Sequence, residues 1–193
     1  PHDPAKAAAL LEEAGWVNDG SGIRKAKGVE GIADGTPLTL RWTVIHHQEI
    51  GEVIQAQYKE VGIDLQVQAV QGPVQLDMVG KRDFDMMYER QRSPSPLILD
   101  QIWNSKWDQP GGWAWTGYAN PELDALVEQL RSIGDAEASC DVARGAQKII
   151  MENALMVPTL SQPVVIGLDK SVIGFQGGAE GNWFFLHNVS IEQ

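Results

Sequence analysis

The sequence predicts an α/β fold in which a small mixed sheet is flanked by helices and followed by an extended tail. Residues 38–44 and 63–70 alternate apolar and polar side chains and are rich in strand formers. Between them, residues 49–61 carry apolar residues at helical spacing. Two strands joined by such a helix through short links normally run parallel, so the unit predicts a parallel strand pair.

Caps and turn residues predict the elements on either side of this unit. Asp3, followed by proline, is typical of a helix start, and Gly15 is typical of a helix end. Residues 23–35 are polar and rich in glycine, which indicates a loop or a short hairpin. A short helix near residues 74–80 is expected to lead to a third strand near residues 84–88.

The second half of the chain predicts two helices and a tail. Asn120 starts a helix that runs to about residue 133, and Asp135 starts another that runs to about residue 153. A β-type run over residues 157–168 follows, broken by prolines and succeeded by glycine-rich loops. We therefore expect residues 1–157 to form one lobe. Residues 158–193 form a tail too short and too rich in glycine to hold its own core.

Composition and charge exclude several classes of protein. The 193 residues carry a formal net charge of −11, which argues against binding to nucleic acid or to anionic lipid. No apolar run approaches the ~20 residues of a membrane helix, so no direct membrane insertion is expected. Cys140 is the one cysteine, which rules out an internal disulfide, and its helical surroundings predict a buried side chain.

The sequence offers no pattern for catalysis, a metal or a cofactor. His46 and His47 are adjacent, and adjacent side chains diverge on both strands and helices, so they rarely converge on one ion. The metallopeptidase spacing His-Glu-x-x-His and the nucleophile elbow Gly-x-Ser-x-Gly are both absent from the sequence. We therefore expect a protein that is not an enzyme and that holds neither metal nor cofactor.

The loop after the third predicted strand is the first candidate binding segment. It contains Glu89, Arg90 and Arg92, and open α/β lobes present their ligand-binding loops at the ends of such strands. Two arginines spaced two residues apart point the same way on an extended backbone. Their guanidinium groups suit a carboxylate, a phosphonate or sugar hydroxyls. The alternative is an exposed loop with ordinary surface arginines, and Arg92 is favoured over Arg90.

Four tryptophans form the second candidate. Trp103, Trp107, Trp113 and Trp115 fall within thirteen positions in loop-like sequence beside a glycine pair. Exposed aromatic faces stack on sugars, peptide side chains or cations, and Trp113 and Trp115 are the favoured contacts. The alternative is that these rings fill the rim of the lobe or meet another lobe that is absent here.

Six stretches, taken in order, resemble the bacterial extracellular solute-binding family of the peptide/nickel type. They are DPAKAAALLEEAGW at 3–16, DGTPLTL at 34–40, IQAQYKEVGID at 54–64, FD at 84–85, TGYANPELDAL at 116–126 and AQKIIMENALMVP at 146–158. Each is weak alone, because many folds use such helix starts and turns. Together they cover most of residues 3–158.

The resemblance implies one lobe of a periplasmic-binding-protein-like fold and a substrate-binding component of an ABC importer. Such proteins deliver a peptide, nickel chelate, opine or oligosaccharide to an ABC permease in the inner membrane, which implies a periplasmic or extracytoplasmic location. It also implies that the N-terminal lobe is missing here and that the tail crosses back to it. The alternative is a solute-sensing or protein-interaction module built on the same fold.

The resemblance also bears on Arg92. In peptide-binding members the matching loop carries an aspartate shortly before a proline, and this aspartate pairs with the peptide α-ammonium group. An ungapped alignment on Pro96 places Arg92 at that position. A positive anchor would then replace a negative one, and a free peptide N-terminus would be repelled.

Overall fold

The protein consists of two compact units, Pro1–Arg90 and Gln91–Gln193. The structure, a computed structural model, describes residues 2–90, 93, 95–161, 163–178 and 184–192. Each unit has its own cluster of buried apolar side chains. The units are therefore described one at a time.

The first unit opens with helix α1 (Pro4–Glu13), which begins where the sequence predicts. The carboxylate of Asp3 accepts a hydrogen bond from the backbone N–H of Lys6 at 2.9 Å, which satisfies one of the free donors of the first turn. The chain leaves the helix through Gly15, whose φ of +86° favours glycine. Strands β1 (Trp16–Val17) and β2 (Lys25–Ala26) then pair antiparallel, so this region contains a short hairpin.

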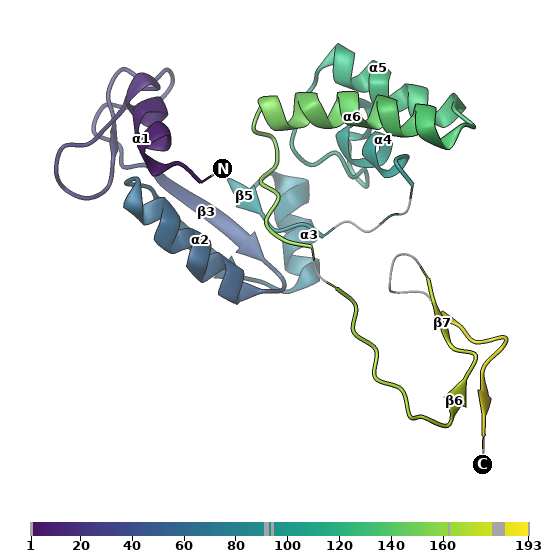
Figure 1. Ribbon diagram of the computed structural model, residues 1–193. Helices are drawn as coiled ribbons and strands as arrows, with labels where there is room; N and C mark the ends of the chain where they lie inside the picture. The colour runs from purple at the N-terminus through teal and green to yellow at the C-terminus, as the bar shows by residue number, and fades with distance from the viewer. Residues whose placement is uncertain (1, 91–92, 94, 162, 179–183, 193) are drawn as a thin grey trace. The chain divides into compact units, whose positions relative to one another are not determined.

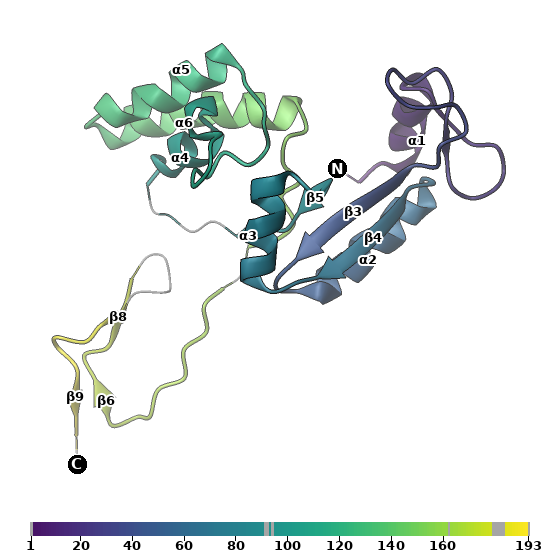
Figure 2. The same cartoon turned by 180° about the vertical axis from the view of Figure 1, so that it is seen from behind.

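A three-stranded parallel sheet forms the centre of the first unit (Figures 1 and 2). Its strands are β3 (Thr39–Val44), β4 (Asp64–Ala69) and β5 (Met86–Met87), in the order β4-β3-β5. Helix α2 (Gln48–Glu60) links β3 to β4, and helix α3 (Gly72–Lys81) links β4 to β5. The predicted strand–helix–strand unit is confirmed. In the described chain, antiparallel pairings occur in separate two-stranded ribbons and in an isolated bridge between Lys25 and Pro37.

Helix α2 packs on β3 and β4 because its apolar residues recur at helical spacing. Ile50, Ile54 and Tyr58 pack against the buried cluster that Trp42, Val44 and Leu65 form. Burying side chains of this size is worth about 1.5–3 kcal/mol each relative to exposure. The sheet is therefore fixed on the helix through alternate residues of its strands.

The second unit is helical up to residue 152. It contains α4 (Ile98–Trp103), α5 (Pro121–Gln129) and α6 (Ala136–Glu152), with 3₁₀ turns at Ser105–Trp107 and Leu130–Ser132. The side chain of Asn120 accepts hydrogen bonds from the backbone N–H groups of Glu122 and Leu123, at 2.9 and 3.1 Å. Asp135 caps α6 in the same way, so both helix starts predicted from sequence are confirmed.

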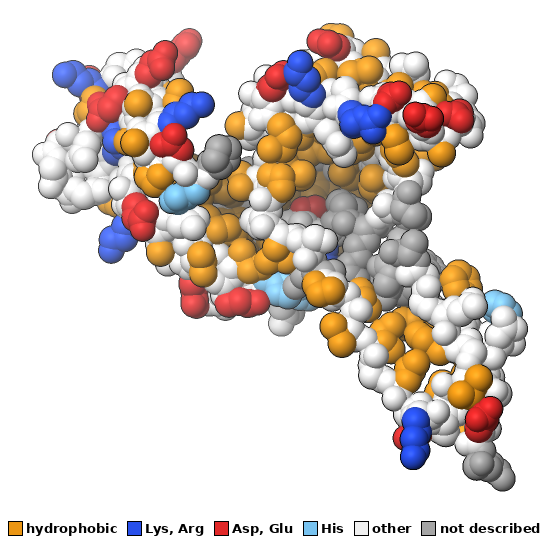
Figure 3. Space-filling view, viewed as in Figure 1, with side chains coloured by type: hydrophobic (Ala, Val, Ile, Leu, Met, Phe, Trp, Pro, Cys, Tyr) orange, Lys and Arg blue, Asp and Glu red, His pale blue; other side chains and the backbone are white. Residues whose placement is uncertain are grey.

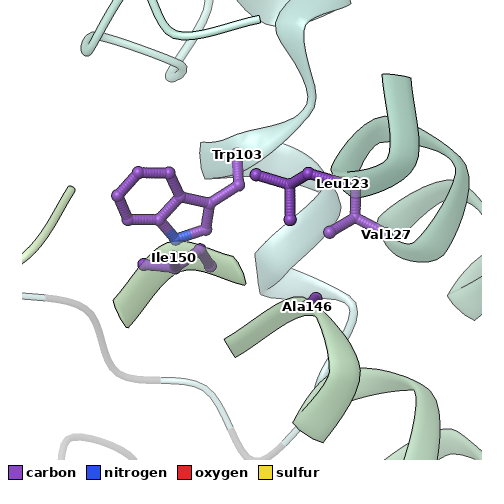
Figure 4. Packing of buried hydrophobic residues seen from close by; sticks show 5 residues of the cluster. All are labelled: Trp103, Leu123, Val127, Ala146 and Ile150. Carbon is purple, nitrogen blue, oxygen red and sulfur yellow. The ribbon is translucent and has the colours of Figure 1, made fainter. Parts of the chain in front are cut away.

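The core of this unit lies between α4, α5 and α6 (Figure 4). It is built from Trp103, Leu123, Val127, Ala146 and Ile150. The sequence predicts loop-like surroundings for Trp103, but this residue ends α4 and is a core residue with 8% exposure. Cys140 is exposed, so the prediction that it is buried is wrong. It stands outside the row of Ala143, Ala146 and Ile150 that faces inward.

The tail contains two short antiparallel ribbons. Strand β6 (Val172–Ile173) pairs with β9 (Ser190–Ile191), and β7 (Gln176–Gly177) pairs with β8 (Phe184–Phe185). The described residues of 157–168 form no strand, because none of them pairs with another strand. Hydrophobic side chains gather on the tail surface (Figure 3). In the described parts of the chain, no helix is long and apolar enough to span a membrane.

Candidate functional site

The carboxyl ends of the parallel strands bring two distant segments to one edge of the sheet. His46 and His47 follow β3, while Tyr88, Glu89 and Arg90 follow β5. The two strands are neighbours and run parallel, so both segments leave the sheet at the same edge. Open α/β sheets bind ligands outside this edge, which makes it the candidate site of the first unit.

Tyr88 is held at this edge from two sides. The imidazole of His47 meets its ring edge-on, with the centroids 5.9 Å apart. The amide of Gln75, a buried residue of α3, donates a hydrogen bond to the Tyr88 carbonyl at 3.3 Å. The segment that carries Glu89 and Arg90 therefore starts from a fixed residue.

His47 occupies an unusual backbone position next to this segment. It precedes the first residue of α2 with a φ of +58°, in the left-handed region that non-glycine residues seldom adopt. Its Nδ1 lies 3.0 Å from a carboxylate oxygen of Glu49. The pKa of Glu49 is lowered mainly by a hydrogen bond from its own backbone N–H and to a smaller extent by this contact with His47. Strained positions of this kind cluster at functional sites.

The predicted residues of the loop are only partly described. Glu89 and Arg90 are exposed and follow β5 after Tyr88, in the loop where they are predicted. Arg92 lies outside the described residues, so the shared direction of the two arginines stays a prediction. Sequence reasoning missed the contact of His47 with Tyr88, because it depends on the pairing of β3 with β5.

In the second unit, Trp113 and Trp115 lie together. Their rings stack with centroids 5.3 Å apart and planes inclined by 17°. Trp113 is 46% exposed, whereas Trp115 is half-buried and donates its indole N–H to the carbonyl of Gly112 at 2.8 Å. The pair thus presents one aromatic face to solvent. The other two tryptophans pack inside the unit, since Trp103 is buried and Trp107 is half-buried.

A depression of about 430 Å³ in the same unit contains a buried carboxylate. It is lined by Leu97, Asp100, Gln101, Trp107 and Arg131. Burial alone would raise the pKa of Asp100, but hydrogen bonds from Arg131, Asn104 and Trp107 outweigh it and lower this pKa overall. Asp100 therefore stays ionised and is fully engaged by protein groups, which suits a structural role.

Among the residues that the structure describes, no group of three or more His, Cys, Asp or Glu side chains could hold a metal ion. His46 and His47 lie with ring centroids 6.4 Å apart and rings inclined by 66°. The arrangement offers a charged loop in one unit and an aromatic surface in the other. Both can recognise a solute without transforming it.

Comparisons with known proteins agree on one family. The family model described as "Bacterial extracellular solute-binding proteins, family 5 Middle" matches residues 1–104. The chain is 26% identical over 191 residues to glutathione-binding protein GsiB of Shigella dysenteriae serotype 1 (strain Sd197) and of Escherichia coli (strain K12). These alignments cover 91% of this chain and 33% of each relative, so the chain spans about a third of their length.

Solved structures of several binding proteins have the same fold. The oligopeptide-binding protein AppA of Bacillus subtilis, in complex with a nonapeptide, matches with a TM-score of 0.64 and 24% identity. NikA of Brucella suis, in complex with Fe(III)-EDTA, matches with a TM-score of 0.61 and 27% identity. A mannohexaose-bound periplasmic oligopeptide-binding protein of Thermotoga maritima matches with a TM-score of 0.68 and 18% identity. The matches cover 79%, 79% and 81% of this chain and 30% of each structure, and they confirm the predicted fold class.

Proposed function

Because this chain belongs to the bacterial extracellular solute-binding proteins of family 5, we propose that it is a lobe of the substrate-binding component of an ABC importer. The protein captures a small solute between two lobes outside the cytoplasm, closes over it by hinge motion and presents it to a permease. The chemistry is recognition alone. The observation that carries this proposal is the family match over residues 1–104.

The site of this lobe lies at the carboxyl edge of the parallel sheet. Glu89 and Arg90 emerge there beside Tyr88, and Arg92 follows two residues after Arg90. In the second unit, the exposed aromatic face of Trp113 is proposed by itself as a surface for solute contact. Relatives bind solutes as different as glutathione, a nonapeptide, Fe(III)-EDTA and mannohexaose, so the family alone does not select the class.

Arg92 selects between these classes. Its place in the loop matches that of the aspartate that receives the peptide ammonium group in peptide-binding members. A guanidinium there repels that group and instead favours a carboxylate, a phosphonate or sugar hydroxyls. The proposed solute is therefore acidic or sugar-like.

Residues 158–193 are proposed to pack on a second lobe. Their apolar side chains are exposed, and the described residues of 157–168 carry β-type sequence without a partner strand. Apolar surface of this extent normally marks an interface. The tail would then connect the two lobes across the hinge.

A thermal-shift screen of the protein encoded by the complete reading frame tests this function. The compounds are ordinary peptides including glutathione, opine-like acids, oligosaccharides and nickel chelates. A solute that binds only the folded state raises the melting temperature by mass action. We expect an acidic or sugar-like compound to produce the shift. Arg92→Ala is expected to weaken its binding by about 10- to 100-fold, the range for a lost charge-assisted contact.

Arg144→Ala is the matched control, because Arg144 is an exposed arginine of α6 that pairs with Asp141. It is expected to leave the shift unchanged. A shift with ordinary peptides that is insensitive to Arg92→Ala would overturn the proposal that Arg92 replaces the peptide-binding aspartate. It would leave the transport role in place. If none of the compounds shifts the melting temperature, the transport role itself is contradicted.

A further inference from the structure

A hydrogen bond to one backbone carbonyl anchors the stacked tryptophans in their unit. Trp115 donates its indole N–H to the carbonyl oxygen of Gly112 at 2.8 Å, and Trp113 stacks on Trp115. The exposed ring of Trp113 therefore takes its orientation from Trp115. The orientation of Trp115 depends in turn on where the peptide group of Gly112 lies.

The peptide group of Gly112 is fixed by a close backbone approach that only glycine allows. Its N–H donates to the carbonyl of Gln109 at 2.8 Å. A Cβ at position 112 would lie 1.9 Å from the carbonyl oxygen of Trp107 and 3.1 Å from that of Gln109. Both atoms belong to the backbone and cannot rotate away. Any side chain at this position must displace either the loop or the 3₁₀ turn that contains Trp107.

That 3₁₀ turn is itself firmly attached to the helices. The N–H and hydroxyl of Ser105 donate to the carboxylate of Asp124 on α5, at 2.8 and 2.6 Å. Trp107 donates its backbone N–H to the Asn104 carbonyl at 3.0 Å and its indole N–H to Asp100 at 3.4 Å. The turn cannot easily yield to a side chain at position 112, so the loop must.

Trp107 is also held through its ring. The Nζ of Lys106 and the guanidinium carbon of Arg131 lie 5.5 and 5.7 Å from the ring centroid. Both distances allow a cation–π attraction. Arg131 in turn pairs with the buried carboxylate of Asp100. A continuous set of contacts thus leads from Asp100 through Trp107 and Gly112 to the tryptophan pair.

We infer that Gly112 and Trp107 are positioning residues that orient the Trp113 face for the solute. This inference rests on the proposed function, in which that face contacts the solute. A face held in one orientation loses less conformational freedom on binding, so a preorganised site binds more tightly than a mobile one. Neither residue needs to touch the solute.

Circular dichroism of the purified chain tests the positioning without any solute. Two stacked indoles couple their electronic transitions, and they give a couplet in the far-ultraviolet spectrum when their transition dipoles are skewed relative to each other. Trp113→Phe defines how much of the spectrum comes from this pair. We expect Gly112→Ala to reduce the couplet to the level of Trp113→Phe, and Trp107→Phe, which removes the indole N–H to Asp100, to weaken it partly.

Gly134→Ala is the matched control, because a Cβ at this loop glycine of the same unit would have no atom within 4 Å. It is expected to keep the full couplet. Equal couplets in Gly112→Ala and the parent chain would overturn the inference, as would equal losses in Gly112→Ala and Gly134→Ala. The helical signal of each variant shows whether it has folded. If Gly112→Ala does not fold, the couplet of Trp107→Phe decides, and an unchanged couplet there overturns the inference.

The outcome is independent of the solute screen. If Gly112→Ala loses the couplet and no compound shifts the melting temperature, the positioning role is retained and the transport role is removed. If Gly112→Ala keeps the couplet and a compound shifts the melting temperature, the transport role is retained and the positioning role is removed. Where both succeed, Gly112→Ala is expected to weaken solute binding about 10-fold, the cost of roughly 1.4 kcal/mol in preorganisation.

Discussion

Asp100 shows how a single buried charge can hold several elements together. Its side chain is 3% exposed and accepts hydrogen bonds from the guanidinium of Arg131, from the amide of Asn104 at 2.9 Å and from the indole of Trp107. The Nζ of Lys106 lies 3.4 Å from the same Asp100 oxygen that accepts from Asn104. Asn104 directly follows α4, and the other partners come from the two 3₁₀ turns, so the carboxylate links α4 to both turns.

Removing this charge is expected to destabilise the second unit. Asp100→Asn would leave Arg131 without its anion and would place amide hydrogens against existing donors. Breaking a fully buried ion pair costs about 3–5 kcal/mol. Because the Arg131 side chain is 50% exposed, we expect a smaller loss of about 2 kcal/mol in the free energy of unfolding. Urea unfolding of both chains at neutral pH measures this loss.

The pH dependence of this difference follows from the lowered pKa of Asp100. The group contributes stability at pH values above its unfolded pKa of about 4, and it loses this contribution as pH falls through the folded pKa. The stability difference between the parent chain and Asp100→Asn is therefore expected to be full at neutral pH and to shrink in acid. A difference that stayed constant down to acid unfolding would contradict the ionised state of Asp100.

At the scale of elements, Gly51 decides how closely α2 approaches the sheet. A Cβ at this buried position would lie 2.7 Å from a methyl group of Val67, whose branched side chain has little freedom to move. Alanine is intrinsically better than glycine in a helix by about 1 kcal/mol. We nevertheless expect Gly51→Ala to lower the free energy of unfolding by about 1 kcal/mol, because overpacking costs more than the propensity gains.

Two further variants separate packing from propensity. Gly145→Ala on α6 meets only Leu126, at 3.6 Å, so it is expected to stabilise the chain by up to about 1 kcal/mol. Adding Val67→Ala to Gly51→Ala removes the obstructing methyl groups and is expected to relieve the overpacking. Chemical unfolding of the three variants checks both effects. A stabilised Gly51→Ala single variant would show that α2 does not approach the sheet closely.

Local signals explain which elements the sequence predicts correctly. Asp3, Asn120 and Asp135 cap helices through contacts within three residues, so their patterns are visible in sequence alone. The alternation in β3 and β4 is equally local. Helix α4 was missed because it is only six residues long and lies close to prolines. Its stability comes from tertiary packing of Trp103, which the sequence does not display.

In the candidate site too, the sequence predicts the features that depend on local patterns and misses those that depend on distant contacts. The position of Glu89 and Arg90 after a strand follows from the local pattern, and so does the concentration of tryptophans. Two other features do not. The edge-on contact of His47 with Tyr88 requires two distant strands to pair, and the role of Gly112 requires knowing which carbonyl it approaches. Such contacts between distant segments are set by topology, which one sequence specifies only indirectly.

At the scale of the whole molecule, the described buried cluster of the second unit ends before the proposed tail begins. The buried cluster of the second unit is drawn from residues 103–150, and its partly buried partners extend no further than Leu155. Beyond that point, Val165 is 88% exposed and Leu186 is 64% exposed. Among the described residues of 158–193, none belongs to this cluster. The tail therefore contributes apolar surface to the chain without completing this core.

Removing residues 158–193 tests this division. We expect the shortened chain to keep the melting temperature of its helical unit within a few degrees, because every residue of the cluster remains. Binding of a hydrophobic dye is expected to fall, because most of the exposed large apolar side chains beyond residue 155 are lost. Calorimetry and dye fluorescence on both chains measure the two effects. A large drop in melting temperature would mean that the tail stabilises this chain directly, and the proposal that it packs on a second lobe would then lose its support.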